Sequence, residues 1–294
     1  MHNVQNQSME LTISSKKAAE FLKVNESTIK RWADGGKLNC SKTSGGHRKF
    51  KITDILILSK QLNNETTGLL LTDKNENVKL KILNRDFELL CKELESLILN
   101  GNSKLTFDFL YSLYILGYSL EEIFDEIIGK TMVKIGIEWR RGKLSIENEH
   151  IATNTLISSL HNFEKEIIKK EFNGRTAVCA GFENEYHELG LFCVKINLIS
   201  EGWKVIYPGI NLPLKSMMKL TKKMKPDIIC ISGSLNSDKK IFNDQLAKLK
   251  KVSDKMGIKI ITGGTLNTVL DSTVVNCNTV MKLNSYLKNN FQKL

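Results

Sequence analysis

Residues 176–190 read TAVCAGFENEYHELG and decide the fold of the carboxyl-terminal part of the chain. The first seven are apolar or small, which is typical of a buried parallel strand, and residues 189–203 follow with the spacing of an amphipathic helix. His187 therefore lies in a loop between strand and helix, at the edge where open parallel sheets bind their ligands. A neutral imidazole there can ligate a metal, and Glu185 is placed to orient its second ring nitrogen.

The rest of this region repeats the alternation of strand and helix. Strand-like runs follow at residues 204–207, 227–232 and 259–262, with helical patterns at 214–223 and 238–255. Such alternation predicts βαβ units and a parallel sheet. Small residues follow two of the strands, as Ser232-Gly233-Ser234 and Gly263-Gly264. We expect them to open a slot between sheet and helices; the alternative is that they are ordinary turns.

Other ligands of this architecture require residues that the loop lacks. A dinucleotide site needs G-x-G-x-x-G directly after the first strand, which residues 180–185 do not supply. A phosphate-binding loop needs Gly-Lys-Ser/Thr, and a receiver domain needs Asp at the end of its first or third strand. Here these strands end in Phe182 and Ser232.

The pattern Glu185-x-His187-x-x-Gly190 resembles the D-x-H-x-x-G signature of cobalamin-binding Rossmann domains, with Glu in place of Asp. That family carries Ser-x-Leu after the third strand, where Ser234 replaces the Leu, and Gly-Gly after the fourth. The resemblance implies that His187 is the lower ligand of cobalt. It also implies that the nucleotide tail of cobalamin lies in the slot beside Ser232, Ser234, Gly263 and Gly264.

Residues 11–58 predict a small DNA-binding module. Ser14 or Ser15 can cap a first helix, and a second helix follows from Glu26 to Ala33, an arrangement that places the second helix in the major groove. Residues 43–50, TSGGHRKF, favour a hairpin wing. The candidate contacts to double-stranded operator DNA are Ser27, Thr28, Lys30, Arg31, His47, Arg48 and Lys49.

The wing resembles the G-G-H-R-x-F wing of MerR-type regulators. Charge agrees, because residues 1–60 hold eleven Lys or Arg against five Asp or Glu, a density typical of nucleic-acid binding. The alternative, a solvated basic surface, leaves the wing motif unexplained.

Composition limits the other functional classes. A chain of 294 residues allows two or three domains. No apolar run approaches the ~20 residues needed to cross a membrane, and the polar first ten residues are no signal peptide. Most of the six cysteines lie in apolar patterns, as reduced thiols do. We predict a cytoplasmic protein without a membrane partner, and a linker at residues 61–77.

Residues 78–172 have helical periodicity and predict a four-helix bundle. The first helix carries a stripe of Leu80, Leu83, Phe87, Leu90, Leu94 and Leu97. Ser119 and Glu122 predict a capping box for the third helix, which ends near Trp139, and the fourth runs to about Phe172. On this fourth helix Ile146, His150, Thr153 and Ile157 share a face. His150 is therefore expected to face the bundle, as a satisfied core histidine or toward a ligand.

Trp139, nine intervening residues and Glu149-His150 match the W-x9-E-H motif of the light-sensing CarH and LitR regulators. These are MerR-type repressors with a helical bundle and a cobalamin-binding domain, and the resemblance covers almost the whole chain in the same order. It implies a winged-helix module with linker in residues 1–77, a bundle in 78–173 and a Rossmann-like cobalamin-binding domain in 174–294.

The resemblance also implies a mechanism. Adenosylcobalamin would be the cofactor, with Trp139 as the lid on its adenosyl group and Glu149 and His150 lining the pocket. The adenosyl-bound form would be a homotetramer that holds operator DNA in the dark. Light would cleave the Co–C bond and release the DNA.

One residue departs from the family. Members that form a bis-histidine photoproduct carry His directly after the lid tryptophan, where this chain has Arg140, which cannot ligate cobalt. Two alternatives stay open: a MerR-type regulator that senses another ligand, or one that uses cobalamin without light. An enzyme is disfavoured, because the DNA-binding module and the bundle leave no room for a substrate domain. We therefore expect no catalytic residues.

Overall fold

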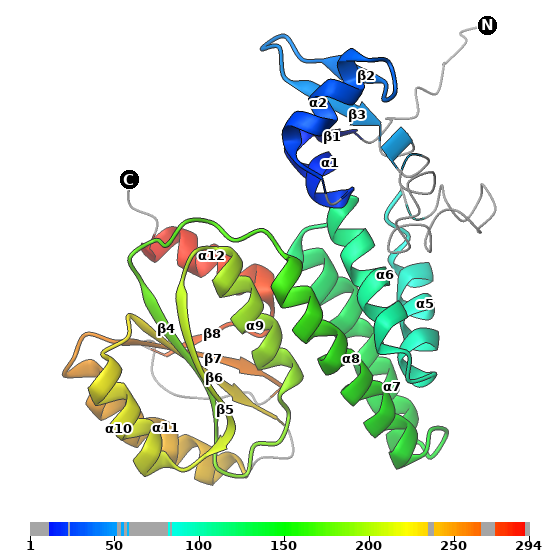
Figure 1. The fold of residues 1–294 in the computed structure, drawn as a ribbon. Helices are drawn as coiled ribbons and strands as arrows, with labels where there is room; N and C mark the ends of the chain where they lie inside the picture. The colour runs from blue at the N-terminus through cyan, green and yellow to red at the C-terminus, as the bar shows by residue number, and fades with distance from the viewer. Residues whose placement is uncertain are drawn as a thin grey trace, which may run out of the picture. The chain divides into compact units, whose positions relative to one another are not determined.

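The structure is a computed structural model, and it describes residues 12–22, 24–51, 54–55, 58, 82, 84–234, 238–265 and 274–291 (Figure 1). The chain divides into two compact units. One comprises residues 1–119 with 131–163, and the other comprises residues 120–130 with 164–294. The predicted linker at 61–77 lies outside the described residues. The three predicted domain ranges remain predictions.

The amino-terminal module forms as the sequence predicts, with one additional strand. Its elements are β1 (Thr12–Ser14), α1 (Ser15–Phe21), α2 (Glu26–Asp34), β2 (Cys40–Lys42) and β3 (Arg48–Lys51). The Ser14 hydroxyl accepts a hydrogen bond from the Lys17 N–H at 3.3 Å and so caps α1. Strands β2 and β3 form the predicted antiparallel hairpin, and β1 pairs with the other edge of β3. Ile29, Leu38 and Phe50 are buried and join the helices to this small sheet.

The helices of the middle region are α5 (Phe87–Leu99), α6 (Ser103–Ile115), η1 (Glu122–Gly129), α7 (Lys130–Arg140) and α8 (Ile146–Glu166). Asp86 caps α5 and Asn102 caps α6, each by accepting a backbone N–H. Helix α8 packs on α6, where the Ser159 hydroxyl donates to the Ser103 carbonyl at 2.8 Å.

Two predictions about these helices are corrected. The predicted third helix is continuous to Trp139, but its first part, η1, is a π-helix. The predicted fourth helix ends at Glu166 rather than near Phe172, and an irregular segment leads from there to β4. Leu80 and Leu83, from the predicted first stripe, lie outside the described residues, whereas Leu90 and Leu94 are buried.

The second unit contains the predicted parallel sheet, in the order β5-β4-β6-β7-β8. Its elements are β4 (Thr176–Phe182), α9 (Leu189–Ser200), β5 (Lys204–Leu212), α10 (Leu214–Met224), β6 (Ile228–Gly233), α11 (Lys239–Asp254), β7 (Lys259–Gly264), β8 (Val275–Asn276) and α12 (Val280–Phe291). Helices α10 and α11 cover one face of the sheet, and α9 and α12 cover the other (Figure 1). The sequence did not predict β8 or α12.

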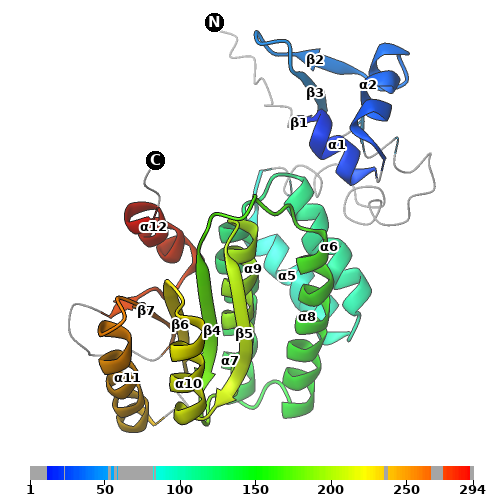
Figure 2. The same ribbon diagram turned by 60° about the vertical axis from the view of Figure 1, so that its left-hand side comes forward.

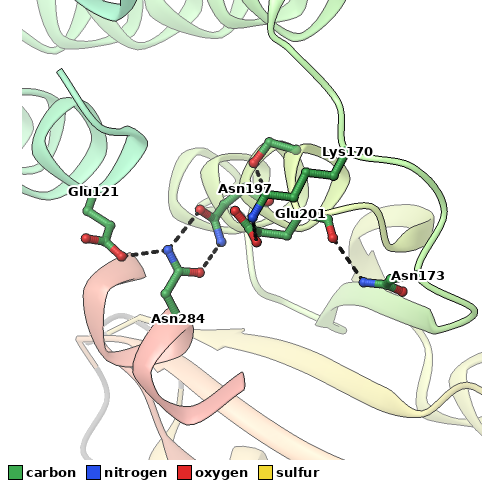
Figure 3. A network of polar contacts seen from close by, with 7 residues as sticks. Glu121, Lys170, Asn173, Asn197, Glu201 and Asn284 are labelled. Carbon is green, nitrogen blue, oxygen red and sulfur yellow. Dashed lines mark hydrogen bonds and ion pairs between the residues drawn. The ribbon is translucent and has the colours of Figure 1, made fainter. Parts of the chain in front are cut away.

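Residues 120–130 are held against α12 by polar contacts, and α12 is linked in turn to α9 (Figure 3). The Asn284 amide donates to Glu121 at 2.7 Å and exchanges hydrogen bonds with the Asn197 amide. One turn further along, the two carboxylate oxygens of Asp125 accept the Val280 and Met281 N–H groups, each at 2.9 Å. Burial raises the pKa of Asp125, and the two backbone hydrogen bonds act in the opposite direction. Asp125 therefore caps α12 from a distant part of the chain.

We expect Asp125→Ala to lower the free energy of unfolding by about 1 kcal/mol, the usual cost of losing a helix cap. Asp244→Ala is the matched control, because Asp244 is an exposed carboxylate that pairs with Lys248 on the surface of α11. Urea titration followed by circular dichroism measures both variants. An equal, small effect of the two substitutions would contradict the capping role.

Candidate functional site

The centre of the candidate site is the pair Glu185 and His187, in the loop between β4 and α9. The Glu185 side chain is 1% exposed, whereas the His187 side chain is 59% exposed. One Glu185 oxygen lies 2.8 Å from the His187 Nδ1 and also accepts the His187 backbone N–H at 2.8 Å. The other oxygen accepts the Ser234 N–H at 2.7 Å. A buried carboxylate bound to Nδ1 favours the Nδ1–H tautomer of the neutral ring, which leaves Nε2 as a lone-pair donor.

The loop that carries this pair is fixed where it leaves β4. Asn184 adopts a left-handed conformation with φ of 70°, which asparagine tolerates well. Its N–H donates to the Asn211 side chain at 2.9 Å, and the Glu185 N–H donates to the Phe182 carbonyl at 3.0 Å. A small pocket of about 40 Å³ opens beside Glu185 and is lined also by Phe182 and the first turns of α11.

Ser232 and Ser234 lie at the carboxyl end of β6, next to the end of β4. The backbone of Ser234 is one of the three donors to Glu185. The Ser232 hydroxyl is buried and has no hydrogen-bond partner within the described part of the chain. Because buried hydroxyls are nearly always paired, Ser232 is suited to a polar group of a ligand.

The two glycines at the end of β7 have a packing role that the sequence did not reveal. A Cβ on Gly264, whose φ is 93°, would lie 2.3 Å from the Gly233 carbonyl oxygen, and one on Gly263 would lie 2.8 Å from that of Cys277. Neighbouring backbone therefore requires glycine at both positions, and the slot remains a prediction. Gly190 differs, because a Cβ there would meet nothing within 4 Å.

The predicted upper-face residues lie at the end of α7 and the start of α8. Trp139 is 40% exposed, and the Arg140 guanidinium bonds back to the Gly136 carbonyl. Glu149 accepts a hydrogen bond from the Thr153 hydroxyl at 2.9 Å, and its other oxygen lies 3.6 Å from the His150 Nε2.

The expectation that His150 faces the core of the bundle is wrong. Its side chain is 65% exposed, and Ile146 on the same face is also exposed. The buried stripe of α8 comprises Ala152, Thr155, Leu156, Ser159, Leu160 and Phe163. His150 is therefore available to a ligand rather than held in the core.

Sequence reasoning missed a set of exposed apolar side chains around these residues. Val133 on α7 and Ile146 and Ile151 on α8 are exposed large apolar side chains, as is Trp139. The detectable signal lay on α8, where Ile146 and Ile151 fall outside the buried stripe that includes the small residues Ala152 and Ser159.

The candidate DNA contacts separate into exposed and engaged side chains. Ser27, Arg31 and His47 are exposed, and Thr28 and Lys49 are partly buried. Lys30 pairs with Glu26 at 2.9 Å on the same helix. Arg48 lies 2.6 Å from Asp34 at the end of α2, so it ties the wing to that helix. Its predicted phosphate contact remains a prediction, and Arg31 is the better probe.

Among the helices of the residues that the structure describes, none has the length and apolar character needed to cross a membrane.

Two family models match the chain. Residues 12–57 match a helix-turn-helix domain, and residues 90–162 match a B12 binding domain. The second match falls on helices α5 to α8 rather than on the parallel sheet. The chain thus combines a helix-turn-helix module with a B12-binding domain.

The similar proteins include regulators and corrinoid proteins. Over 145 residues the chain is 26% identical to the HTH-type transcriptional repressor CarH of Myxococcus xanthus, a match that covers 48% of this chain and 46% of that protein. It is 23% identical to dimethylamine corrinoid protein 2 of Methanosarcina acetivorans, over 49% of this chain and 67% of that protein. The solved monomethylamine corrinoid protein of Methanosarcina barkeri has a TM-score of 0.56 at 15% identity, covering 69% of this chain and 99% of that one.

These findings confirm the predicted fold class and are consistent with a CarH-type regulator. The chain matches about half of the length of the CarH relative.

We expect the free protein to hold His187 as the Nδ1–H tautomer, because Glu185 accepts that proton. Glu185→Gln keeps an oxygen for this bond and should keep the tautomer. Glu185→Ala should shift the ring toward the Nε2–H form that a neutral histidine side chain favours in water. Long-range ¹H–¹⁵N spectra of the histidine ring, recorded where the ring is neutral, distinguish the forms. Finding the parent as Nε2–H would contradict the proposed role of Glu185.

Proposed function

We propose that this protein is a cobalamin-dependent, light-responsive transcriptional repressor in which His187 ligates cobalt from the lower face. The observation that carries the proposal is the buried Glu185 carboxylate on Nδ1, which favours the Nδ1–H tautomer and so puts the ring's lone pair on Nε2 of an exposed side chain. Support comes from the B12 binding domain match and from the similarity to CarH.

The residues around His187 suit the group. Ser232 offers a buried hydroxyl that needs a partner, and Gly190 leaves open space beside the histidine loop. We assign Glu185, His187, Gly190, Ser232 and Ser234 to the cobalamin site, with Gly263 and Gly264 shaping the strand ends beside it. When bound, adenosylcobalamin supplies a cobalt–carbon bond that visible light breaks.

The exposed side chains on α7 and α8 would cover the upper face. Trp139 presents a large apolar surface for an adenosyl group. Glu149 and His150 would line the polar side of the same pocket. Because Arg140 cannot ligate cobalt, the upper ligand in the light-exposed protein would be water or His150. The exposed apolar surface that the adenosyl group covered would then return to water, at a cost that favours rearrangement of the helices.

Operator DNA would be read by α2 and the β2–β3 wing, with Arg31 and Ser27 near the bases and His47 and Lys49 near the phosphates. Several modules on one homotetramer would raise the effective concentration of each for DNA. Loss of the tetramer in light would therefore release DNA without a change in any base contact. Operator DNA as a partner agrees with the predicted cytoplasmic localisation.

Similarity to corrinoid proteins makes methyl-group transfer the second candidate. The helix-turn-helix match favours regulation, and we propose no catalytic residue. The two readings differ in their response to light. A regulator of this type should change its oligomeric state and its DNA affinity on illumination, and a methyl-transfer protein should do neither.

We expect His187→Ala to abolish lower-face ligation by the protein, so that the absorption spectrum of bound adenosylcobalamin changes to a base-off form without histidine. Gly190→Ala is the companion variant. It adds a methyl group in a helix, which should not lower stability, yet it should weaken cobalamin binding if Gly190 faces the cofactor. An unchanged absorption spectrum for His187→Ala would contradict the assignment of His187 as the lower cobalt ligand.

Trp139→Ala should reduce assembly of the adenosylcobalamin-loaded protein in the dark and weaken its preference for adenosylcobalamin over methylcobalamin. Phe172→Ala is the control, since Phe172 is an exposed aromatic residue that lies outside both helices. Analytical ultracentrifugation before and after green light measures the assembly. If Trp139 were only structural, the variant would lower stability and leave the ligand preference untouched.

A further inference from the structure

Positive charge is concentrated in a second part of the chain, besides the DNA-binding module. Residues 204–260 contain thirteen lysines against four aspartates, an excess of nine. Residues 61–203, in contrast, contain sixteen basic and twenty-two acidic residues. Since the whole chain has a net charge of +11, residues 204–260 and the first sixty residues carry its positive charge.

Helix α10 contributes a row of lysines. Lys215, Lys219, Lys222 and Lys223 are all exposed, and their spacing places them on one side of the helix. Met217 and Thr221 are buried on the side that faces the sheet. The helix contains no acidic residue. Like charges three and four residues apart destabilise a helix, so this row costs stability in the free protein.

Helix α11 continues the surface. Lys240, Lys251 and Lys255 are exposed, while Lys248 pairs with Asp244 and Lys250 pairs with Asp254. The two helices lie side by side (Figure 2) and bury Met217, Phe242 and Leu246 in one cluster against the same face of the sheet. We use the name α10–α11 surface for seven of the exposed lysines on these helices and at the end of α11; they are Lys215, Lys219, Lys222, Lys223, Lys240, Lys251 and Lys255.

The chemistry of this surface fits an extended polyanion. Lys215 and Lys223 are eight residues apart, which is about 12 Å along a helix, so the charges are too spread to hold one small anion. An anionic membrane would also need apolar anchors. Among the described side chains of α10 and α11, Ile241 is the exposed large apolar residue. DNA needs no such anchor, because phosphate contacts supply the affinity.

We propose that the α10–α11 surface is a second DNA-binding surface, which contacts the phosphate backbone without reading sequence. It rests on the proposal that the chain binds DNA through its helix-turn-helix module, but not on cobalamin. Each phosphate neutralised by a lysine releases counterions and steepens the salt dependence of binding. Two surfaces on one chain also raise each other's effective concentration for the same duplex.

The test uses the full chain and a labelled mixed-sequence DNA duplex, with fluorescence anisotropy measured over a series of KCl concentrations. The variant K215Q/K219Q/K222Q removes three charges from α10. The control K169Q/K282Q/K288Q removes three exposed charges outside the surface, two of them on α12 across the sheet. The slope of log K against log[KCl] should become shallower by about 0.9 for each lost phosphate contact in the first variant only. Equal slopes for the first variant and the parent overturn the proposal.

A comparison with Arg31→Ala distinguishes this proposal from the proposed function, and a flotation experiment distinguishes DNA from a membrane. If Arg31→Ala weakens binding while K215Q/K219Q/K222Q behaves as the parent does, the helix-turn-helix assignment stands and the second surface fails. If the reverse holds, the surface stands and the helix-turn-helix role fails. Flotation with phosphatidylserine vesicles is the third arm. Vesicle binding that requires the α10 lysines, without an effect of these lysines on DNA, would assign the surface to a membrane and overturn the proposal.

Discussion

The candidate site depends on one buried carboxylate. Glu185 is almost fully enclosed, so its charge must be met by hydrogen-bond donors, and the two N–H groups of His187 and the N–H of Ser234 supply them. These bonds fix three features together: the course of the loop after β4, the position of the β6 end, and the ring nitrogen that His187 presents to a ligand. Aspartate is the usual residue of the motif that this loop resembles. Glutamate performs the same bonding here with a longer side chain.

A second constraint acts at residues 120–130. Glu121 and Asp125 bind this helical segment to α12, and the same stretch of helix continues through α7 to Trp139. Its first part is a π-helix. This form is rare in proteins, and where it occurs it often lies at a functional site. The helix that ends near Trp139 therefore begins in a segment that side-chain contacts fix to α12.

The sequence predicted features that depend on local pattern and missed those that depend on packing. Thr176–Phe182 was predicted to the residue, because a short apolar run between turn residues has few alternatives. The two-residue β8 lacks such a run, and β1 is a three-residue edge strand. His150 was assigned to the wrong face because Ile146 and Ile157 outweighed small residues such as Ala152 and Ser159, which allow α8 to pack closely. The bond from Ser234 to Glu185 spans forty-nine positions, and no spacing rule predicts it.

The most direct test of the central claim is electron paramagnetic resonance of the protein loaded with the cobalt(II) form of cobalamin. The axial nitrogen splits each cobalt line, as a triplet for ¹⁴N and as a doublet for ¹⁵N. We predict a triplet in the unlabelled protein and a doublet after incorporation of ¹⁵N-histidine into the otherwise unlabelled chain. A triplet that persists in the labelled protein would mean that the cofactor's own base binds cobalt, and it would contradict ligation by His187.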